Sequence, residues 1–215
     1  MPIALSRFFR LPGVFLFGCF MCFVGRLPAS DLRTIVFFGD SLTAGYGLAD
    51  PSTEAYPALI QEKIAGAGLN WRAVNAGLSG ETTSGGLRRV DWILRQPVDI
   101  FFLALGANDG LRGVDPGVSR SNLQKIIDRV RDKNPKVKLV LAGMQMPPAM
   151  GQDFSKEFEK MFPEVAEKNQ AVLVPFLLEG VGGRIDLNQS DRIHPTAQGH
   201  TIIAETVWKV LRPLL

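Results

Sequence analysis

Cysteine and histidine are scarce in this sequence, which has only two of each among its 215 residues. Both cysteines, Cys19 and Cys22, lie in the apolar segment Leu11 to Val24, so the rest of the chain has none. That body therefore excludes disulfides, thiolate zinc sites and cysteine nucleophiles. Two histidines leave little from which to build a zinc site, and we expect neither a metal nor an organic cofactor.

The body of the chain also lacks an excess of positive charge. The formal net charge is +3, but Arg7, Arg10 and Arg26 lie in the first 26 residues, which contain no acidic side chain. The remaining basic residues are matched in number by the 21 acidic ones. We therefore expect no nucleic-acid partner, because proteins that bind nucleic acids carry a basic surface.

Three familiar active-site motifs are absent. No Gly-x-Ser-x-Gly segment occurs, so by motif the chain is not an ordinary α/β-hydrolase. Neither Gly-x-x-x-x-Gly-Lys-Ser/Thr nor a Gly-x-Gly-x-x-Gly after a strand occurs, so nothing supports nucleotide binding.

The amino terminus has the pattern of a secretory signal. Met1 to Arg10 is basic, Leu11 to Val24 is almost entirely apolar, and Leu27 to Ser30 offers small residues for cleavage. The apolar part is shorter than the roughly 20 residues of a membrane span. We predict a signal at residues 1–30, export to the periplasm or beyond the cell, and one domain at residues 31–215. An uncleaved amino-terminal anchor and a start codon placed too early are the alternatives.

Strand and helix patterns alternate along the rest of the chain. Strands are predicted at residues 35–38, 71–76, 98–105, 137–142 and 171–176. Helices are predicted at residues 55–67, from the 77–84 loop to about 94, and at 116–133, 154–168 and 195–211, with Pro163 kinking or splitting the fourth. This order predicts a doubly wound α/β domain with a parallel sheet. The loops that follow the strands then share one rim, and we expect functional side chains there.

Ser41 lies just beyond the carboxyl end of the first predicted strand, after Gly39 and Asp40. A serine at this place acts as a nucleophile when a base reaches it and amide donors face it. The alternative is that Asp40 and Ser41 only cap the next helix.

His194 is the candidate base, because it lies in a rim loop directly before the last predicted helix. Asp191, three residues earlier, can bond the other ring nitrogen, fix the tautomer and stabilise the imidazolium. A loop Asp-x-x-His is more often structural than catalytic when it stands alone. His200 lies inside the helical pattern and is expected to be a surface or helix-packing residue.

Candidate oxyanion donors occur in two other rim loops. Gly80 offers an unobstructed backbone N–H, Asn108 offers a side-chain amide at the end of the most apolar strand, and the Ser41 N–H is a third donor. A simple turn at Gly80 and a cap at Asn108 are the alternatives. The coincidence of all these groups on one predicted rim favours a catalytic site.

Five segments carry a resemblance to a known family: residues 38–46, 74–82, 105–113, 174–181 and 191–195. The chain resembles the GDSL or SGNH hydrolases from about residue 34 to its end. The resemblance implies a flavodoxin-like three-layer sandwich. It also implies Ser41 as nucleophile, His194 as base and then acid, Asp191 as the orienting carboxylate, and Ser41, Gly80 and Asn108 as the oxyanion hole.

The expected reaction is hydrolysis of an ester, thioester or lysophospholipid through an acyl-enzyme. We expect apolar rim residues to bind the acyl or aryl group, namely Leu78, Leu111, Met146, Pro147 and Pro148. A transient membrane contact and a monomeric state are further expectations. Two other hypotheses stay open: a carbohydrate O-deacetylase of the same family, and a non-catalytic binding module that keeps the fold.

Overall fold

The computed structural model describes residues 32–215, so the predicted signal at residues 1–30 lies outside the described part. Five strands form one parallel sheet in the order β2-β1-β3-β4-β5, which is the flavodoxin-like order. The strands are β1 (Arg33–Gly39), β2 (Trp71–Gly77), β3 (Ile100–Ala104), β4 (Lys138–Ala142) and β5 (Val172–Val174). This arrangement confirms the predicted α/β class and the parallel sheet.

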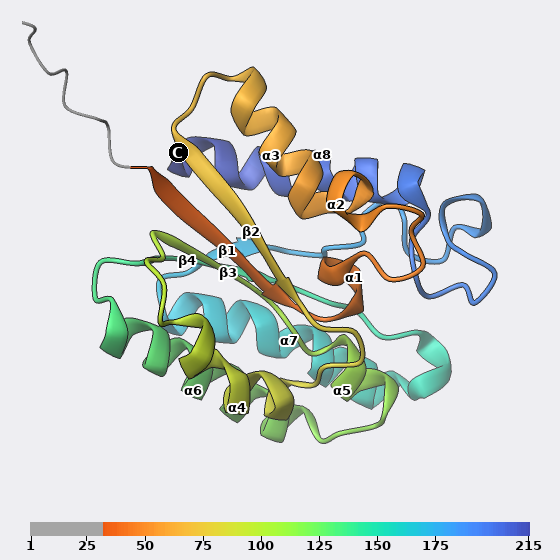
Figure 1. Ribbon diagram of the computed structural model, residues 1–215. Coiled ribbons are helices and arrows are strands. Elements are labelled where there is room, and N and C mark those ends of the chain that lie inside the picture. The colour runs from red at the N-terminus through yellow and green to blue at the C-terminus, as the bar shows by residue number, and fades with distance from the viewer. Residues whose placement is uncertain (1–31) are drawn as a thin grey trace, which may run out of the picture. The chain divides into compact units, whose positions relative to one another are not determined.

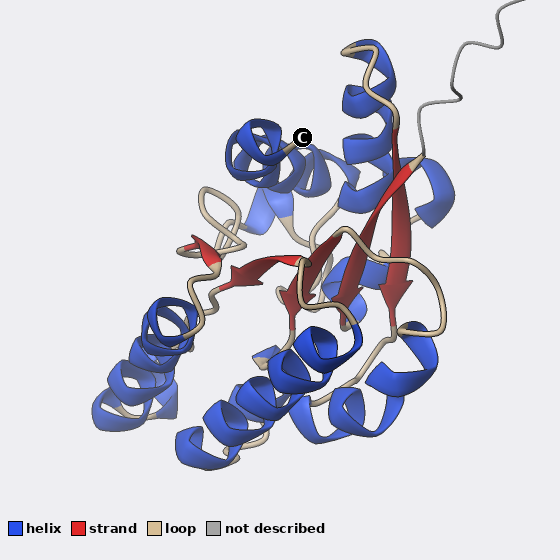
Figure 2. Ribbon diagram, turned by 90° about the vertical axis from the view of Figure 1, so that its left-hand side faces the viewer, coloured by secondary structure: helices blue, strands red, loops and turns tan. Residues whose placement is uncertain are grey.

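Helices cover both faces of the sheet (Figures 1 and 2). One face carries α3 (Tyr56–Gly66) and α8 (Ala197–Leu211). The other face carries α4 (Thr83–Ile93), α6 (Pro116–Lys133) and α7 (Gln152–Lys168). Shorter helices and turns lie in the connections: α1 (Ser41–Ala44), α2 (Pro51–Glu54), α5 (Ala107–Leu111) and 3-10 turns at Pro148–Met150, Ile185–Leu187 and Arg212–Leu214.

The core lies along the two central strands, β1 and β3. Phe37 packs against Phe102 with ring centroids 5.1 Å apart, and Phe38 packs against Phe101 at 5.3 Å on the opposite face. All four rings are fully buried. Strands that are covered by helices on both faces have continuous apolar sequences, which explains why β3 reads as an unbroken apolar run. The site residues at the ends of these strands therefore rest on a rigid core.

Two connections differ from the sequence prediction. The predicted loop at residues 44–53 contains α2, because Asp50 accepts the Ser52 N–H at 3.0 Å and Pro51 suits a first helical turn. The last helix begins at Ala197 rather than at Pro195, because the Thr196 side chain caps it.

Pro163 was predicted to kink or split the fourth predicted helix, and the splitting is wrong. Helix α7 runs from Gln152 to Lys168 without interruption. Its buried face includes Phe158 and Phe162 before the proline and Val165 after it. Burial of this face on both sides of Pro163 offsets the hydrogen bond that a proline removes from a helix.

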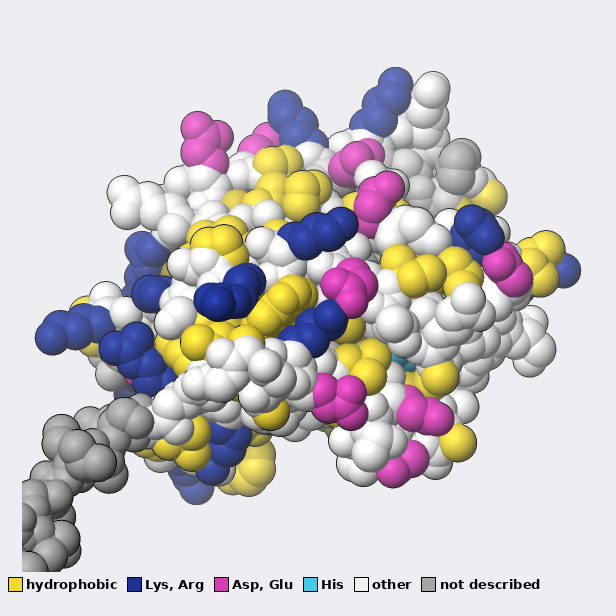
Figure 3. Space-filling view, turned by 90° about the horizontal axis from the view of Figure 1, so that it is seen from above, with side chains coloured by type: hydrophobic (Ala, Val, Ile, Leu, Met, Phe, Trp, Pro, Cys, Tyr) yellow, Lys and Arg dark blue, Asp and Glu magenta, His cyan; other side chains and the backbone are white. Residues whose placement is uncertain are grey.

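The face formed by α3 and α8 carries Lys and Arg interspersed with Asp and Glu (Figure 3). This mixed charge agrees with the balanced composition of the body. Among residues 32–215, no helix has both the length and the apolar character needed to cross a membrane.

Candidate active site

Ser41 stands at the first position of α1, directly after β1. The turn requires glycine at position 39, because a Cβ there would lie 2.0 Å from the Thr43 Oγ1. Asp40 caps α1 by accepting the Leu42 N–H on Oδ1 at 3.0 Å, as the capping alternative predicted. The Ser41 Oγ is not used for capping and lies 3.0 Å from Nε2 of His194.

His194 is held from its other side by Asp191. The His194 Nδ1 lies 2.6 Å from Oδ2 of Asp191. The Asp191 Oδ1 accepts the backbone N–H of Ile193 at 2.9 Å and of His194 at 3.0 Å. The bond with the imidazole, followed by these backbone bonds, lowers the pKa of Asp191 to about 2. The carboxylate therefore stays charged near neutral pH, and a proton on Nδ1 leaves Nε2 free to accept the serine proton.

Tyr46, which the sequence reasoning did not assign to the site, packs against the imidazole. Its ring centroid lies 4.6 Å from that of His194. The Gln189 amide donates to the Tyr46 carbonyl at 2.7 Å, and the Gln189 N–H donates to the His194 carbonyl at 2.7 Å. These contacts fix the loop before α8 against the loop after β1.

Asn108 lies in α5, after β3, and borders the same cavity as Ser41 and His194. Its Nδ2 donates to Oδ2 of Asp40 at 3.4 Å. Asp40 is only 2% exposed, and burial raises its pKa to about 7 against the opposing effect of these hydrogen bonds. The Asp40 carboxyl thus links the cap of α1, which begins at Ser41, to the side chain of Asn108.

Gly80 lies in the loop between β2 and α4. Its φ is +78°, and its carbonyl accepts a hydrogen bond from Arg112 Nη2 at 3.0 Å. A left-handed residue of this kind is usually glycine. Gly80 is not among the residues that line the cavity beside Ser41.

A buried carboxylate ties the Gly80 loop to the Asn108 helix. Asp109 follows Asn108 and is 1% exposed. It accepts the Thr83 N–H at 2.8 Å and the Thr83 hydroxyl at 2.5 Å, and the Ser119 hydroxyl donates to it at 3.2 Å. Because Thr83 begins α4 directly after the Gly80 loop, both predicted donor loops share one anchor.

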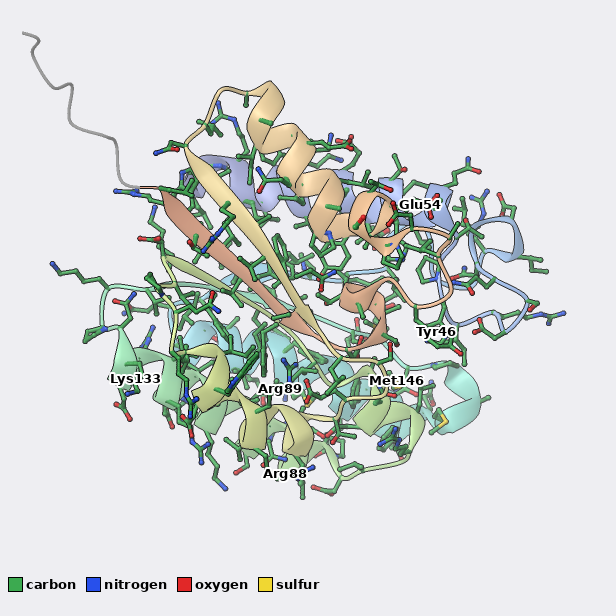
Figure 4. All side chains as sticks on the ribbon, viewed as in Figure 1. Tyr46, Glu54, Arg88, Arg89, Lys133 and Met146 are labelled. Carbon is green, nitrogen blue, oxygen red and sulfur yellow. The ribbon has the colours of Figure 1, made fainter. Side chains whose placement is uncertain are left out.

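A second anchor lies under the same loop. Arg89, on α4, forms an ion pair with the buried Glu81 and donates to the Ala76 carbonyl at 3.0 Å. Its guanidinium lies over the Phe38 ring, 4.3 Å from the centroid. Arg89 lies on the side of α4 that faces the sheet (Figure 4). Hydrogen bonds inside a protein are stronger than in water, so this buried cluster holds the loop rigidly.

An open cavity of about 550 Å³ begins at Ser41 and His194. Three of the predicted substrate-binding residues line it: Leu111, Met146 and Pro147. Leu78 does not line the cavity. Its backbone N–H donates to the Gly39 carbonyl, which holds it next to the end of β1, and its side chain is exposed to solvent. The Pro148 side chain lies outside the described part of the structure.

The sequence reasoning missed a second part of the cavity wall. That wall includes Phe176, Leu178, Gly182, Gly183 and Arg192. The hydrophobic residues after β5 could have indicated a binding wall. However, the 177–190 segment was predicted only as a loop, and its sequence does not indicate that it packs beside the cavity. The wall as a whole is mainly apolar.

His200 has the helix-packing role expected of it. It is 1% exposed, and its Nδ1 accepts the Tyr56 N–H at 3.2 Å. Burial lowers its pKa to about 4, so the ring is neutral near pH 7. Among residues 32–215, no group of three or more His, Cys, Asp or Glu side chains is placed to hold a metal ion.

Residues 37–202 match the GDSL-like lipase/acylhydrolase family. The chain belongs to this family. It is 36% identical to the esterase TesA of Pseudomonas aeruginosa, over 92% of this chain and 96% of the relative. It is 33% identical to thioesterase 1/protease 1/lysophospholipase L1 of Escherichia coli K12, over 98% and 96% respectively. A crystal structure of TesA superposes with a TM-score of 0.80 at 37% identity, covering 85% of this chain and all of that one.

This GDSL hydrolase is thus a carboxylic ester hydrolase, and small-molecule esters are its substrates. The similarity to TesA extends over the described domain and agrees with the sandwich fold that the resemblance implied.

Proposed function

We propose that this GDSL hydrolase cleaves esters and thioesters of apolar acyl groups through a serine acyl-enzyme. The observation that carries the proposal is the chain of contacts from Ser41 through His194 to Asp191, at 3.0 and 2.6 Å, beside an apolar cavity. Acyl transfer to a serine requires a nucleophile, a base that contacts it and a carboxylate that orients the base, in this order of contacts.

In the proposed first step, the His194 Nε2 takes the proton of Ser41 as its Oγ attacks the carbonyl carbon. The Ser41 N–H, the Gly80 N–H and the Asn108 amide stabilise the oxyanion, and Asp191 stabilises the imidazolium. The imidazolium returns its proton to the leaving oxygen or sulfur, and an acyl-enzyme remains. Water, activated by His194, then releases the acid and frees Ser41.

The cavity wall supports an acyl or aryl group as the part of the substrate that binds beside Ser41. Leu111, Met144, Met146, Phe176 and Leu178 line it with apolar surface. The names of the relatives, an esterase and a thioesterase/lysophospholipase, support the same substrate class. The described lining is mainly apolar, which favours an acyl or aryl group over an acetylated sugar. Export and a monomeric state stay predictions, as does contact with a membrane.

The test is hydrolysis of p-nitrophenyl esters over a series of acyl lengths by the wild type, Ser41→Ala and the matched control Ser190→Ala. Ser190 is an exposed serine in the loop that carries Asp191. We expect Ser41→Ala alone to lose activity and fluorophosphonate labelling while keeping its circular dichroism spectrum. Undiminished hydrolysis by folded Ser41→Ala would exclude the proposed nucleophile.

A further inference from the structure

Arg192 is the charged exception in the wall of the cavity. Apart from His194, the other described residues that line it are apolar, neutral polar or glycine. Arg192 follows Asp191, is exposed, and lines the same cavity as Ser41 and His194. A solvent-exposed cation in the wall of an apolar cavity can contact a charged part of the substrate.

The guanidinium of Arg192 has no partner within residues 32–215. No hydrogen bond or ion pair of its side chain occurs there, whereas Arg184 in the same segment donates to Asp186 at 3.0 and 2.8 Å. The adjacent Asp191 carboxylate is already occupied by His194 and two backbone N–H groups. Arg192 is therefore available to an external anion.

The backbone at Arg192 is held in an unusual conformation. Its φ is +60°, in the left-handed region that non-glycine residues rarely adopt. The Arg192 N–H donates to the Gln189 carbonyl at 2.9 Å, and the Asp191 side chain binds the next two N–H groups. With Cα atoms spaced about 3.8 Å apart, the Cα of Arg192 stays within roughly 8 Å of that of His194.

We propose that Arg192 forms an anion-binding subsite that takes the phosphate of a glycerophosphate leaving group. The inference rests on the proposed function, in which His194 protonates the leaving oxygen. In a lysophospholipid, three glycerol carbons separate that oxygen from the phosphate, a distance that an arginine side chain anchored beside His194 can bridge. In acyl-coenzyme A, the whole pantetheine arm separates the sulfur from the first phosphate. A guanidinium binds phosphate through paired, charge-assisted hydrogen bonds.

The experiment compares two esters with the same medium-length acyl chain, a lysophosphatidylcholine and a monoacylglycerol, each below its micelle concentration. The measured quantity is the ratio of kcat/KM for the phosphate ester to kcat/KM for the neutral ester. Arg192→Gln is the test variant and Arg192→Lys the charge-conserving variant. Arg184→Gln is the matched control, because it removes an exposed arginine that is already paired.

We expect Arg192→Gln to lower the ratio about three- to tenfold, as for the loss of one partly exposed charge-assisted bond. The ratio for Arg192→Lys should lie between those of the wild type and Arg192→Gln, and the ratio for Arg184→Gln should equal that of the wild type. Added salt should reduce the difference in ratio between the wild type and Arg192→Gln. The ratio for acyl-coenzyme A against the p-nitrophenyl ester stays unchanged in Arg192→Gln.

Equal loss on both esters would overturn the inference, because it would show that Arg192 only supports the loop. A lowered ratio in Arg192→Gln that occurs only when the substrate is embedded in phosphatidylcholine vesicles would also overturn the inference. Arg192 would then bind phosphates of the lipid surface and not the phosphate of the leaving group. If the wild type hydrolyses p-nitrophenyl esters but neither of these two esters, the subsite alone is overturned. If it does not hydrolyse p-nitrophenyl esters either, the proposed function is overturned, and with it the subsite.

Discussion

Two buried groups, Asp40 before Ser41 and His200 in α8, should give the free energy of unfolding two opposing pH dependences. Burial lowers the pKa of His200 from 6.5 to about 4. Burial raises the pKa of Asp40 from 3.8 to about 7. Each group is therefore neutral in the folded chain over a pH range in which it is charged in the unfolded chain.

The two effects have opposite signs. Between pH 6.5 and 4, the unfolded chain binds a proton at His200 that the folded chain does not, so stability falls as the pH is lowered. Between pH 3.8 and 7, the folded chain holds a proton on Asp40 that the unfolded chain releases, so stability falls as the pH is raised. At about 1.4 kcal/mol per pKa unit, the full effects are about 3 kcal/mol for His200 and about 4 kcal/mol for Asp40.

The opposing slopes nearly cancel in the wild type between pH 4 and 6.5. His200→Asn keeps an acceptor for the Tyr56 N–H but does not titrate, so its unfolding free energy should fall by about 1.4 kcal/mol per unit as the pH rises. Asp40→Asn keeps an acceptor for the Leu42 N–H, and its unfolding free energy should rise by the same amount per unit. The lowered pKa of Asp191, about 2, acts below this window.

Urea unfolding followed by circular dichroism at several pH values measures these slopes. The double variant Asp40→Asn/His200→Asn is the control and should again be flat across the window. Parallel profiles for the wild type and both single variants would refute the reasoning, because they would mean that neither group changes its proton affinity on folding.

Three further outcomes are expected. Asp191→Asn lowers kcat about 10³- to 10⁴-fold with little change in KM, because an amide neither fixes the tautomer with the proton on Nδ1 nor stabilises the imidazolium. A loss of kcat below tenfold in ester hydrolysis would contradict this expectation. Asn108→Ala lowers kcat about 10²- to 10³-fold through loss of an oxyanion donor, whereas a change confined to KM would assign it to ground-state binding. Gly86→Ala places a Cβ 2.3 Å from Leu105 Cδ1 and costs about 1–3 kcal/mol, so an unchanged urea midpoint would show that the helix shifts freely.

Of the groups predicted at the rim, Ser41, Asn108 and His194 border one cavity, whereas Gly80 does not line it. Ser41 and Asn108 follow apolar strands, and parallel strands bring their carboxyl ends together whatever the side chains are. His194 and Asp191 are close in sequence, so their pairing needed no knowledge of the fold. Such placements can be predicted from the sequence because each depends on a single strand or a single loop.

The contacts between different loops could not be predicted from local sequence patterns. The Asp40–Asn108 hydrogen bond joins residues 68 positions apart, and nothing in either local pattern indicates it. The cavity wall at Phe176 depends on how an irregular segment folds back, which is decided by tertiary packing. For the same reason Leu78, apolar and in a rim loop, was predicted to bind substrate and instead points to solvent.

The cavity is assembled from parts that come from different regions of the sheet. The serine and the asparagine follow the central strands β1 and β3, and the histidine precedes α8. Most of the apolar wall comes instead from the segments that follow β4 and β5, at residues 144–147 and 176–183. Natural selection or directed evolution can therefore reshape the apolar wall by substitutions in these two segments, while Ser41, Asn108 and His194 stay as they are.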